Sequence, residues 1–199
     1  SLLQARDVAK SFGSRQVLDA LDLDIAPGAR LGVIGPNGGG KTTLLRILAG
    51  EETQDAGELT RRRGLVVAFL PQQVEGDERA APATLRVARP DLDELEAELA
   101  AIEDQMAAAT TDLDRLSRLL RRQEDVLERW TAAGGPGFDG RARALLGEVG
   151  LDTDDLGKPT RVLSGGQRKL VGLAACLLCD PDVLLLDEPE AQIDVEARE

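Results

Sequence analysis

The 199-residue sequence contains no histidine and no tyrosine, and only 2% of its residues are aromatic. The lack of histidine excludes Ser-His-Asp and Cys-His catalysis and His-ligated zinc, so a general base has to be a carboxylate or a lysine. The scarcity of aromatic side chains disfavours base stacking on an aromatic platform. A net charge of −12 disfavours a surface built for nucleic acid, and we expect no direct DNA binding.

Cysteine and long apolar runs are equally scarce. Cys176 and Cys179 are the only cysteines and cannot supply a four-thiolate zinc site, and we interpret them as small buried apolar residues. No apolar run reaches the roughly 18 residues of a membrane span, and no signal peptide opens the chain, which predicts a cytoplasmic protein. The 42% of hydrophobic residues are enough for the core of one domain with an appendage.

The first informative motif is a glycine-rich loop at residues 35–42, which matches the pattern G-x-x-x-x-G-K-[ST]. Backbone N–H groups converge on a phosphate chain only where side chains do not block the approach, and the helix that follows adds the positive end of its dipole. Lys41 is placed to reach the β- and γ-phosphates, and the Thr42 hydroxyl to ligate Mg²⁺. The residues expected to bind the nucleotide here are Gly35, Pro36, Asn37, Gly38, Gly39, Gly40, Lys41, Thr42 and Thr43.

A second motif is the apolar run 183–186, which ends in the acids Asp187 and Glu188. A buried parallel strand delivers such carboxylates at its C-terminal end, beside the phosphate loop of an α/β fold. We expect Asp187 to hold Mg²⁺ and Glu188 to polarise the attacking water as a general base. The alternative interpretation of Glu188 is a solvated acid.

The elements around these motifs alternate between strands and helices, which is typical of an α/β fold. Glycine in the position of Gly50 is a common C-cap, and it ends the helix expected after the phosphate loop. Strands are expected at residues 2–8, 17–25, 31–34 and 64–70, and helices at 41–49, near 140–149 and near 165–179.

Residues 91–131 differ, because their apolar residues are spaced alternately three and four apart. The pattern predicts two helices joined by the short link 107–111, folded back as an antiparallel hairpin, with Thr110 or Thr111 capping the second helix. The stripe serves a single partner helix, so we expect the hairpin to project; the alternative is a bundle edge. The expected seam is Leu92, Leu95, Leu99, Ile102, Met106, Leu113, Leu116, Leu120, Gln123, Leu127 and Trp130.

The segment LSGGQ at 163–167 resembles the signature motif of the ATP-binding-cassette (ABC) superfamily, and it precedes the 183–188 run as it does in that family. The resemblance implies that these residues cap the γ-phosphate of ATP held by the opposite domain of a head-to-tail pair. Ser164 opens a helix, which makes its N-terminus an anion site. The implied signature residues are Ser164, Gly165, Gly166 and Gln167.

The same resemblance extends to residues outside the three motifs. It implies that Gln72 is the Q-loop glutamine, which senses Mg²⁺ and the attacking water. It implies that Phe12 stacks on adenine, with a core phenylalanine as the alternative, and that Asp194 is the D-loop aspartate that contacts the partner domain. The implied cofactors are ATP and Mg²⁺.

The hairpin is similar to the arm of ABC-F proteins, which are soluble tandem ATPases that often bind ribosomes and affect translation or antibiotic sensitivity. The stretch DEPEAQID also resembles the ABC-F sequence DEPTNHLD, from which Glu190, Ala191 and Gln192 depart. The arm carries many acids, which suits cross-hairpin ion pairs better than contact with rRNA. The alternatives are the ATP-binding subunit of a membrane transporter and a non-hydrolysing ATP-dependent interaction module.

We therefore expect a P-loop α/β fold of the ABC type, with a helical subdomain and an inserted antiparallel hairpin. The expected parts are an ATP-binding core at 1–88, the arm at 89–133, and the signature region with the acidic strand at 134–199. The resemblance implies a switch histidine on a strand beyond this chain, and a second cassette. We therefore expect an ATPase that needs a second cassette for activity.

Overall fold

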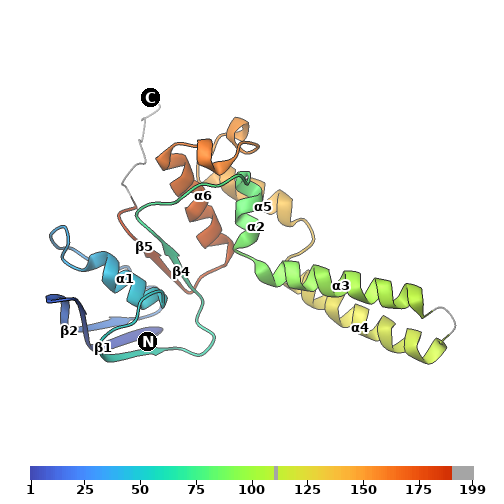
Figure 1. Ribbon diagram of the computed structural model, residues 1–199, viewed down its shortest axis with the longest axis horizontal. Helices are drawn as coiled ribbons and strands as arrows, with labels where there is room; N and C mark the ends of the chain where they lie inside the picture. Colours follow the sequence, from blue (N-terminus) through green and yellow to red (C-terminus); the bar gives the residue numbers. More distant parts are fainter. Residues whose placement is uncertain (110–111, 190–199) are drawn as a thin grey trace.

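The computed structural model describes residues 1–109 and 112–189 (Figure 1). Its first sheet is antiparallel and contains β1 (Leu3–Phe12), β2 (Arg15–Ile25) and β3 (Ala56–Arg61), with β1 in the centre. The strands expected at 2–8 and 17–25 are confirmed. Strand β3 was not predicted from the sequence, because its six residues AGELTR are mostly exposed and lack a buried apolar face.

A second, parallel sheet pairs β4 (Val67–Leu70) with β5 (Val183–Leu186). It lies between α1 (Lys41–Ala49) and α6 (Gly165–Leu178) (Figure 1). Buried leucine and isoleucine side chains of α1 pack with β1 and β5 into one core. Gly50 caps α1 in the left-handed conformation, as expected. Apolar packing on both sides explains why these two strands read as continuous apolar runs.

The strand expected at 31–34 does not form, and this prediction was wrong. The segment is apolar, yet Ile34 is 97% exposed. A strand is stabilised by hydrogen bonds to a neighbour, and within residues 1–109 and 112–189 no strand pairs with this segment. The strand expected at 64–70 is also shorter, because residues 63 and 64 form a turn before β4.

A helical subdomain contains α2 (Ala81–Val87), α5 (Phe138–Glu148) and α6, with short 3₁₀ turns η1 (Thr153–Asp155) and η2 (Thr160–Val162). Its core includes Leu85, Phe138 and Val171. The helices expected near 140–149 and 165–179 are α5 and α6. In the described part of the chain, no helix is both long enough and apolar enough to cross a membrane.

The arm consists of α3 (Pro90–Ala108) and α4 (Leu113–Ala132), which run antiparallel and project from the rest of the molecule (Figure 1). The expected seam was wrong in part on α4: Leu113, Leu120 and Leu127 are exposed, and Leu119 and Val126 are buried instead, while Trp130 packs against the seam as expected. Asp112 caps α4, its Oδ1 accepting the Arg115 N–H at 2.9 Å. The residues Thr110 and Thr111 lie outside the described residues.

Candidate functional site

The glycine-rich loop enters α1 through backbone conformations that favour glycine. Gly38 has φ 72° and Gly40 has φ 87°. A Cβ on Gly40 would lie 2.6 Å from the Val17 carbonyl oxygen, so the loop packs against β2 there. Gly40 is also the N-cap of α1, and it has no side chain to occupy the N–H groups of the first turn. The loop thus presents the free helix N-terminus that an anion binds.

Lys41 lies within this loop. Its ammonium donates to the Gly35 carbonyl oxygen at 2.9 Å and to the Pro36 carbonyl oxygen at 3.1 Å. The Gly39 N–H donates to the same Pro36 oxygen at 3.0 Å, which closes a tight turn. The lysine charge is therefore held at the mouth of the loop, where a phosphate chain would meet it.

The two acids meet the loop and the Q-loop glutamine at one edge of the parallel sheet. The Thr42 hydroxyl donates to Asp187 Oδ2 at 2.7 Å, and the Gln72 side-chain amide donates to Glu188 Oε2 at 2.6 Å. Asp187 is buried, while Glu188 is exposed. Because β4 and β5 are parallel, their carboxyl ends share this edge and deliver Gln72 and the acids side by side.

A cavity of about 460 Å³ connects these groups. It brings together Phe12, much of the loop and the pair Gln72–Glu188, and it also includes Arg15 and Val17, which were not predicted from the sequence. Arg15 donates to the Gly38 carbonyl oxygen at 2.7 Å. No motif marks Arg15, and only the pairing of β1 with β2 carries it to the loop. The lining is Phe12, Arg15, Val17, Asn37, Gly38, Gly40, Lys41, Thr42, Thr43, Gln72 and Glu188.

The signature residues lie apart from this cavity, at the start of α6. Ser164 Oγ accepts the Gln167 N–H at 3.1 Å, and Gln167 Oε1 accepts the Ser164 N–H at 2.8 Å. This capping box satisfies the backbone N–H groups of Ser164 and Gln167, and the first turn of α6 also holds the amides of Gly165 and Gly166. The expected D-loop residue Asp194 lies outside the described residues.

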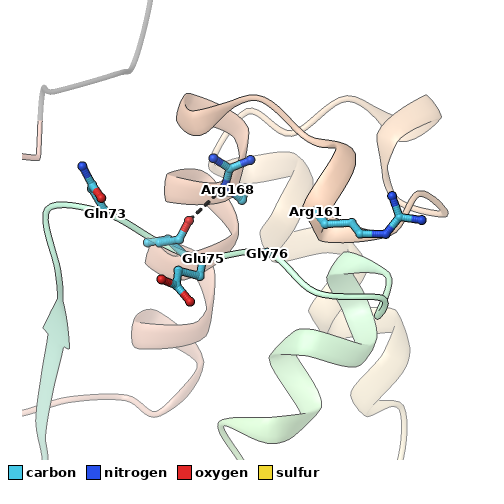
Figure 2. A pocket seen from close by; sticks show the side chains of 6 residues that line it. Gln73, Glu75, Gly76, Arg161 and Arg168 are labelled. Carbon is cyan, nitrogen blue, oxygen red and sulfur yellow. Dashed lines mark hydrogen bonds between the residues drawn. The ribbon is translucent and has the colours of Figure 1, made fainter.

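A second cavity, of about 470 Å³, is lined by residues of the segment 73–76 and by Arg161 and Arg168 (Figure 2). It lies between the segment that follows Gln72 and the start of α6. Arg168 donates to the Val74 carbonyl oxygen at 2.9 Å and so ties α6 to this segment. Arg161 reaches the same cavity from η2 and pairs with Glu78. The cavity therefore belongs to the junction between the Q-loop and the signature region.

Lys169 is a further residue of this region that was not predicted from the sequence. It is 1% exposed, and its ammonium donates to the carbonyl oxygens of Gln72, Asp187 and Glu188. Burial lowers the pKa of Lys169, and the negative charges of Asp187 and Glu188 oppose that shift. A lysine within a helix that also carries Arg168 resembles a surface residue in sequence, so no pattern distinguishes it.

The donor set fits Mg²⁺ and a triphosphate. Mg²⁺ prefers hard oxygen ligands, and it uses one or two carboxylates together with substrate phosphates in place of a full protein cage. Thr42, Gln72 and Asp187 supply a hydroxyl, an amide and one carboxylate at a single edge. Among the described residues no group of three or more acids, histidines or cysteines could hold a metal on its own. The glycine loop beside them is a cradle that a Cβ would fill.

Curated proteins match nearly the whole length of this chain. The tylosin resistance ATP-binding protein TlrC of Streptomyces fradiae is 40% identical over 198 residues, covering 99% of this chain and 36% of that protein. The energy-dependent translational throttle protein EttA of Mycobacterium tuberculosis is 30% identical over 202 residues, covering 96% of this chain and 33% of that protein. The chain thus spans about a third of the length of these curated relatives.

A solved structure shows the same fold. It is the dimeric, post-hydrolysis state of the ATP-binding cassette MJ0796 bound to ADP and Pi, with a TM-score of 0.62 and 20% identity. The likeness covers 97% of this chain and 76% of that one. Residues 18–191 match the ABC transporter family. This match spans the phosphate loop, the signature helix and the acidic strand, and the chain belongs to the ABC family of ATP-binding domains.

Proposed function

We propose that the site binds Mg²⁺-ATP and, within the full-length protein, hydrolyses its terminal phosphate bond. The contact that supports this most directly joins Thr42 to Asp187 at 2.7 Å across 145 residues of sequence. Lys41 and the loop N–H groups hold the phosphates. When bound to Thr42, Gln72 and Asp187, Mg²⁺ would supply neutralising charge at the phosphate oxygens.

Glu188 is the proposed general base. Its carboxylate projects from the same edge as Asp187, is exposed to water, and accepts the Gln72 amide at 2.6 Å. That hydrogen bond orients the carboxylate, which accepts the proton of an attacking water. Phosphoryl transfer leaves the protein mainly to position reactants and to stabilise charge, which are the roles proposed here for Glu188 and Lys41.

Replacing Glu188 tests the proposal. In the full-length protein, Glu188→Gln keeps the size and the hydrogen bond but removes the base, so kcat for ATP falls by about a hundredfold or more while ATP binding remains. Glu148→Gln, on the exposed surface of α5, is the matched control and leaves kcat unchanged. Steady-state phosphate release measures both, and undiminished hydrolysis by Glu188→Gln excludes this residue as the base.

Ser164 is proposed to act on ATP bound to a second cassette. The first turn of α6 lies apart from the cavity that holds Lys41, whose lining includes no signature residue. The MJ0796 cassette is dimeric in its solved structure, which supports a paired arrangement. Asp194 is proposed to contact the same partner. Ser164→Ala is then expected to lower turnover while ATP affinity, measured at low protein concentration, stays within about twofold.

We further propose that the full-length protein is a cytoplasmic, tandem-cassette ABC-F protein that acts on the ribosome, in translation or in antibiotic resistance. Two relatives support this proposal, because TlrC is named as a tylosin resistance protein and EttA as a translational throttle protein. The arm formed by α3 and α4 also supports it over a transporter subunit. Co-sedimentation of the Glu188→Gln protein with ribosomes in ATP tests the proposal, and absence from the ribosome pellet contradicts it.

A further inference from the structure

The side chain of Lys169 is one of the largest fully buried side chains of the described residues, although it carries an ammonium group. It lies on α6, five residues after Ser164. Its Nζ donates to the Gln72 carbonyl oxygen at 3.3 Å, to the Asp187 carbonyl oxygen at 3.4 Å, and to the Glu188 carbonyl oxygen. One cation therefore contacts the backbone of three of the four residues that carry the proposed metal and base chemistry, Thr42 being the exception.

The backbone at Glu188 needs such support. Its φ of 45° is in the left-handed region, which is unfavourable for a residue with a Cβ. Conformations of this kind persist where the surroundings fix them, and they are frequent at functional sites. On one side, the Asp187 N–H donates to the Leu70 carbonyl oxygen at 2.9 Å. On the other side, Lys169 holds the Glu188 carbonyl.

The role of the Lys169 ammonium differs from that of an apolar side chain that would only fill the same space. A buried cation pays a desolvation cost that a methionine of similar length does not, and its bonds to carbonyl oxygens offset that cost. The neighbouring core residues Val171 and Ala174 on α6 are apolar. What the ammonium adds over an apolar side chain is thus the fixed placement of three carbonyl groups.

We propose that Lys169 is a positioning residue that holds Gln72 and Glu188 in one arrangement from the helix carrying the signature motif. This inference rests on the proposed function of the site. Lys169 does not line the nucleotide cavity, so it acts through the backbone of the two residues. It also joins α6, which begins with Ser164, to the acidic end of β5. A shift of α6 is thereby transmitted to the base.

The first test is Lys169→Met in the full-length protein. Misplacing a reacting group by about 1 Å costs about a hundredfold in rate, so kcat for ATP is expected to fall about a hundredfold. The dissociation constant for ATP stays within about twofold, since the phosphate loop does not contact Lys169. Arg143→Met is the matched control, because Arg143 is an exposed cation on α5 outside the proposed site, and it leaves kcat unchanged.

A second readout does not depend on turnover. In the nucleotide-free protein, amide hydrogen exchange at Asp187 is expected to be about tenfold faster in Lys169→Met, while amides in α1 keep their protection. Lys169→Arg retains the charge and the donors, and it is expected to restore part of kcat. Should Lys169→Met fail to fold, Lys169→Gln replaces it, and a lower kcat is again expected.

Two results would overturn the inference. One is an unchanged kcat in Lys169→Met or Lys169→Gln. The other is a parallel loss of kcat and ATP affinity, with exchange at Asp187 unchanged. A lack of turnover in the unsubstituted protein contradicts the proposed function instead. In that case the exchange measurement still decides whether Lys169 holds the backbone at 187–188.

Discussion

Gly40 occupies the most constrained position of the phosphate loop. Its φ of 87° and the Val17 carbonyl, which a Cβ would approach to 2.6 Å, both exclude a side chain. Gly40→Ala is therefore expected to cost about 1–3 kcal/mol of unfolding free energy, because strain and a backbone clash add. It also displaces the loop, so ATP binding weakens more than about tenfold. Urea unfolding and nucleotide titration measure the two effects.

Gly147 provides the matched control for that substitution. It lies in α5, and a Cβ built there meets no atom within 4 Å. Alanine favours a helix over glycine by about 1 kcal/mol, so Gly147→Ala is expected to leave the protein equally or more stable. If both alanines destabilise equally, the loop geometry at Gly40 is not the cause.

At the residue scale, Cys176 is predicted to be an unreactive thiol in the folded protein. Burial raises the pKa of the Cys176 thiol to about 11, and burial also raises the pKa of Cys179. The thiolate is the reactive form, so at pH 8 iodoacetamide is expected to modify Cys176 about a hundredfold more slowly than a free cysteine. Mass spectrometry follows the reaction, with the guanidinium-unfolded protein as the reactive reference. Rapid modification of the folded protein would contradict the interpretation of Cys176 as a buried apolar residue.

At the scale of elements, the spacing of apolar residues predicted the helices of the arm but did not determine which face of α4 is buried. Leucines of α4 satisfy a three-four spacing in two phases, and the phase with more leucines is not the buried one. Trp130, which packs into both helical cores and donates to Glu96 Oε1 at 3.1 Å, belongs to both phases and does not distinguish them. The members of α4 that are buried are Leu119 and Val126. Sequence spacing contains no information that selects one of the two phases.

Adjacent leucines test the observed phase with one type of substitution. Leu119 is 7% exposed and Leu120 is 48% exposed. Leu119→Ala removes buried methyl groups and leaves a cavity, so it is expected to cost about 2–4 kcal/mol in the stability of the hairpin. Leu120→Ala is expected to cost less than about 1 kcal/mol. Hydrogen exchange of the α3 and α4 amides measures this difference, and equal costs would contradict the seam.

The helix 41–49 was predicted more accurately from the sequence than the strand expected at 31–34. The helix after the phosphate loop was predicted with its observed bounds, because its apolar face, its glycine C-cap and the preceding motif all agree. The segment 31–34 failed, because a strand depends on a neighbour that a local pattern does not reveal. The site followed the same rule: motifs located Lys41 and Asp187, whereas Arg15 and Lys169 reach it only through tertiary packing.

At the scale of the whole molecule, the arm interrupts the chain between two segments that contact each other. Residues 76–80 follow the Q-loop, and residues 159–161 precede the signature motif. Ala80 forms a β-bridge with Pro159, and the Thr160 N–H donates to the Arg79 carbonyl oxygen at 2.8 Å. Gly76 leaves room for this approach, because a Cβ there would lie 2.4 Å from the Thr160 carbonyl oxygen. The arm is thus inserted across a closed junction.

The junction contains an acid whose protonation is expected to loosen it. The Arg79 side chain, its backbone N–H and Thr160 hold the pKa of Asp77 well below its usual value, at about 2. A carboxyl group with a lowered pKa in the folded state stabilises that state above its unfolded pKa of about 4, and this contribution is lost as the pH falls towards 2. At neutral pH the contribution is complete and independent of pH.

Asp77→Asn removes this contribution at all pH values. The melting temperature of the substituted protein is expected to lie below that of the unsubstituted protein at pH 5 to 7, and the difference is expected to shrink between pH 4 and pH 2. Circular dichroism melts at each pH measure it. Asp104→Asn, on the exposed face of α3, changes the formal charge equally without touching the junction. A difference that is as large at pH 2.5 as at pH 7, or that appears equally in Asp104→Asn, would show that the Asp77 carboxylate does not close the junction.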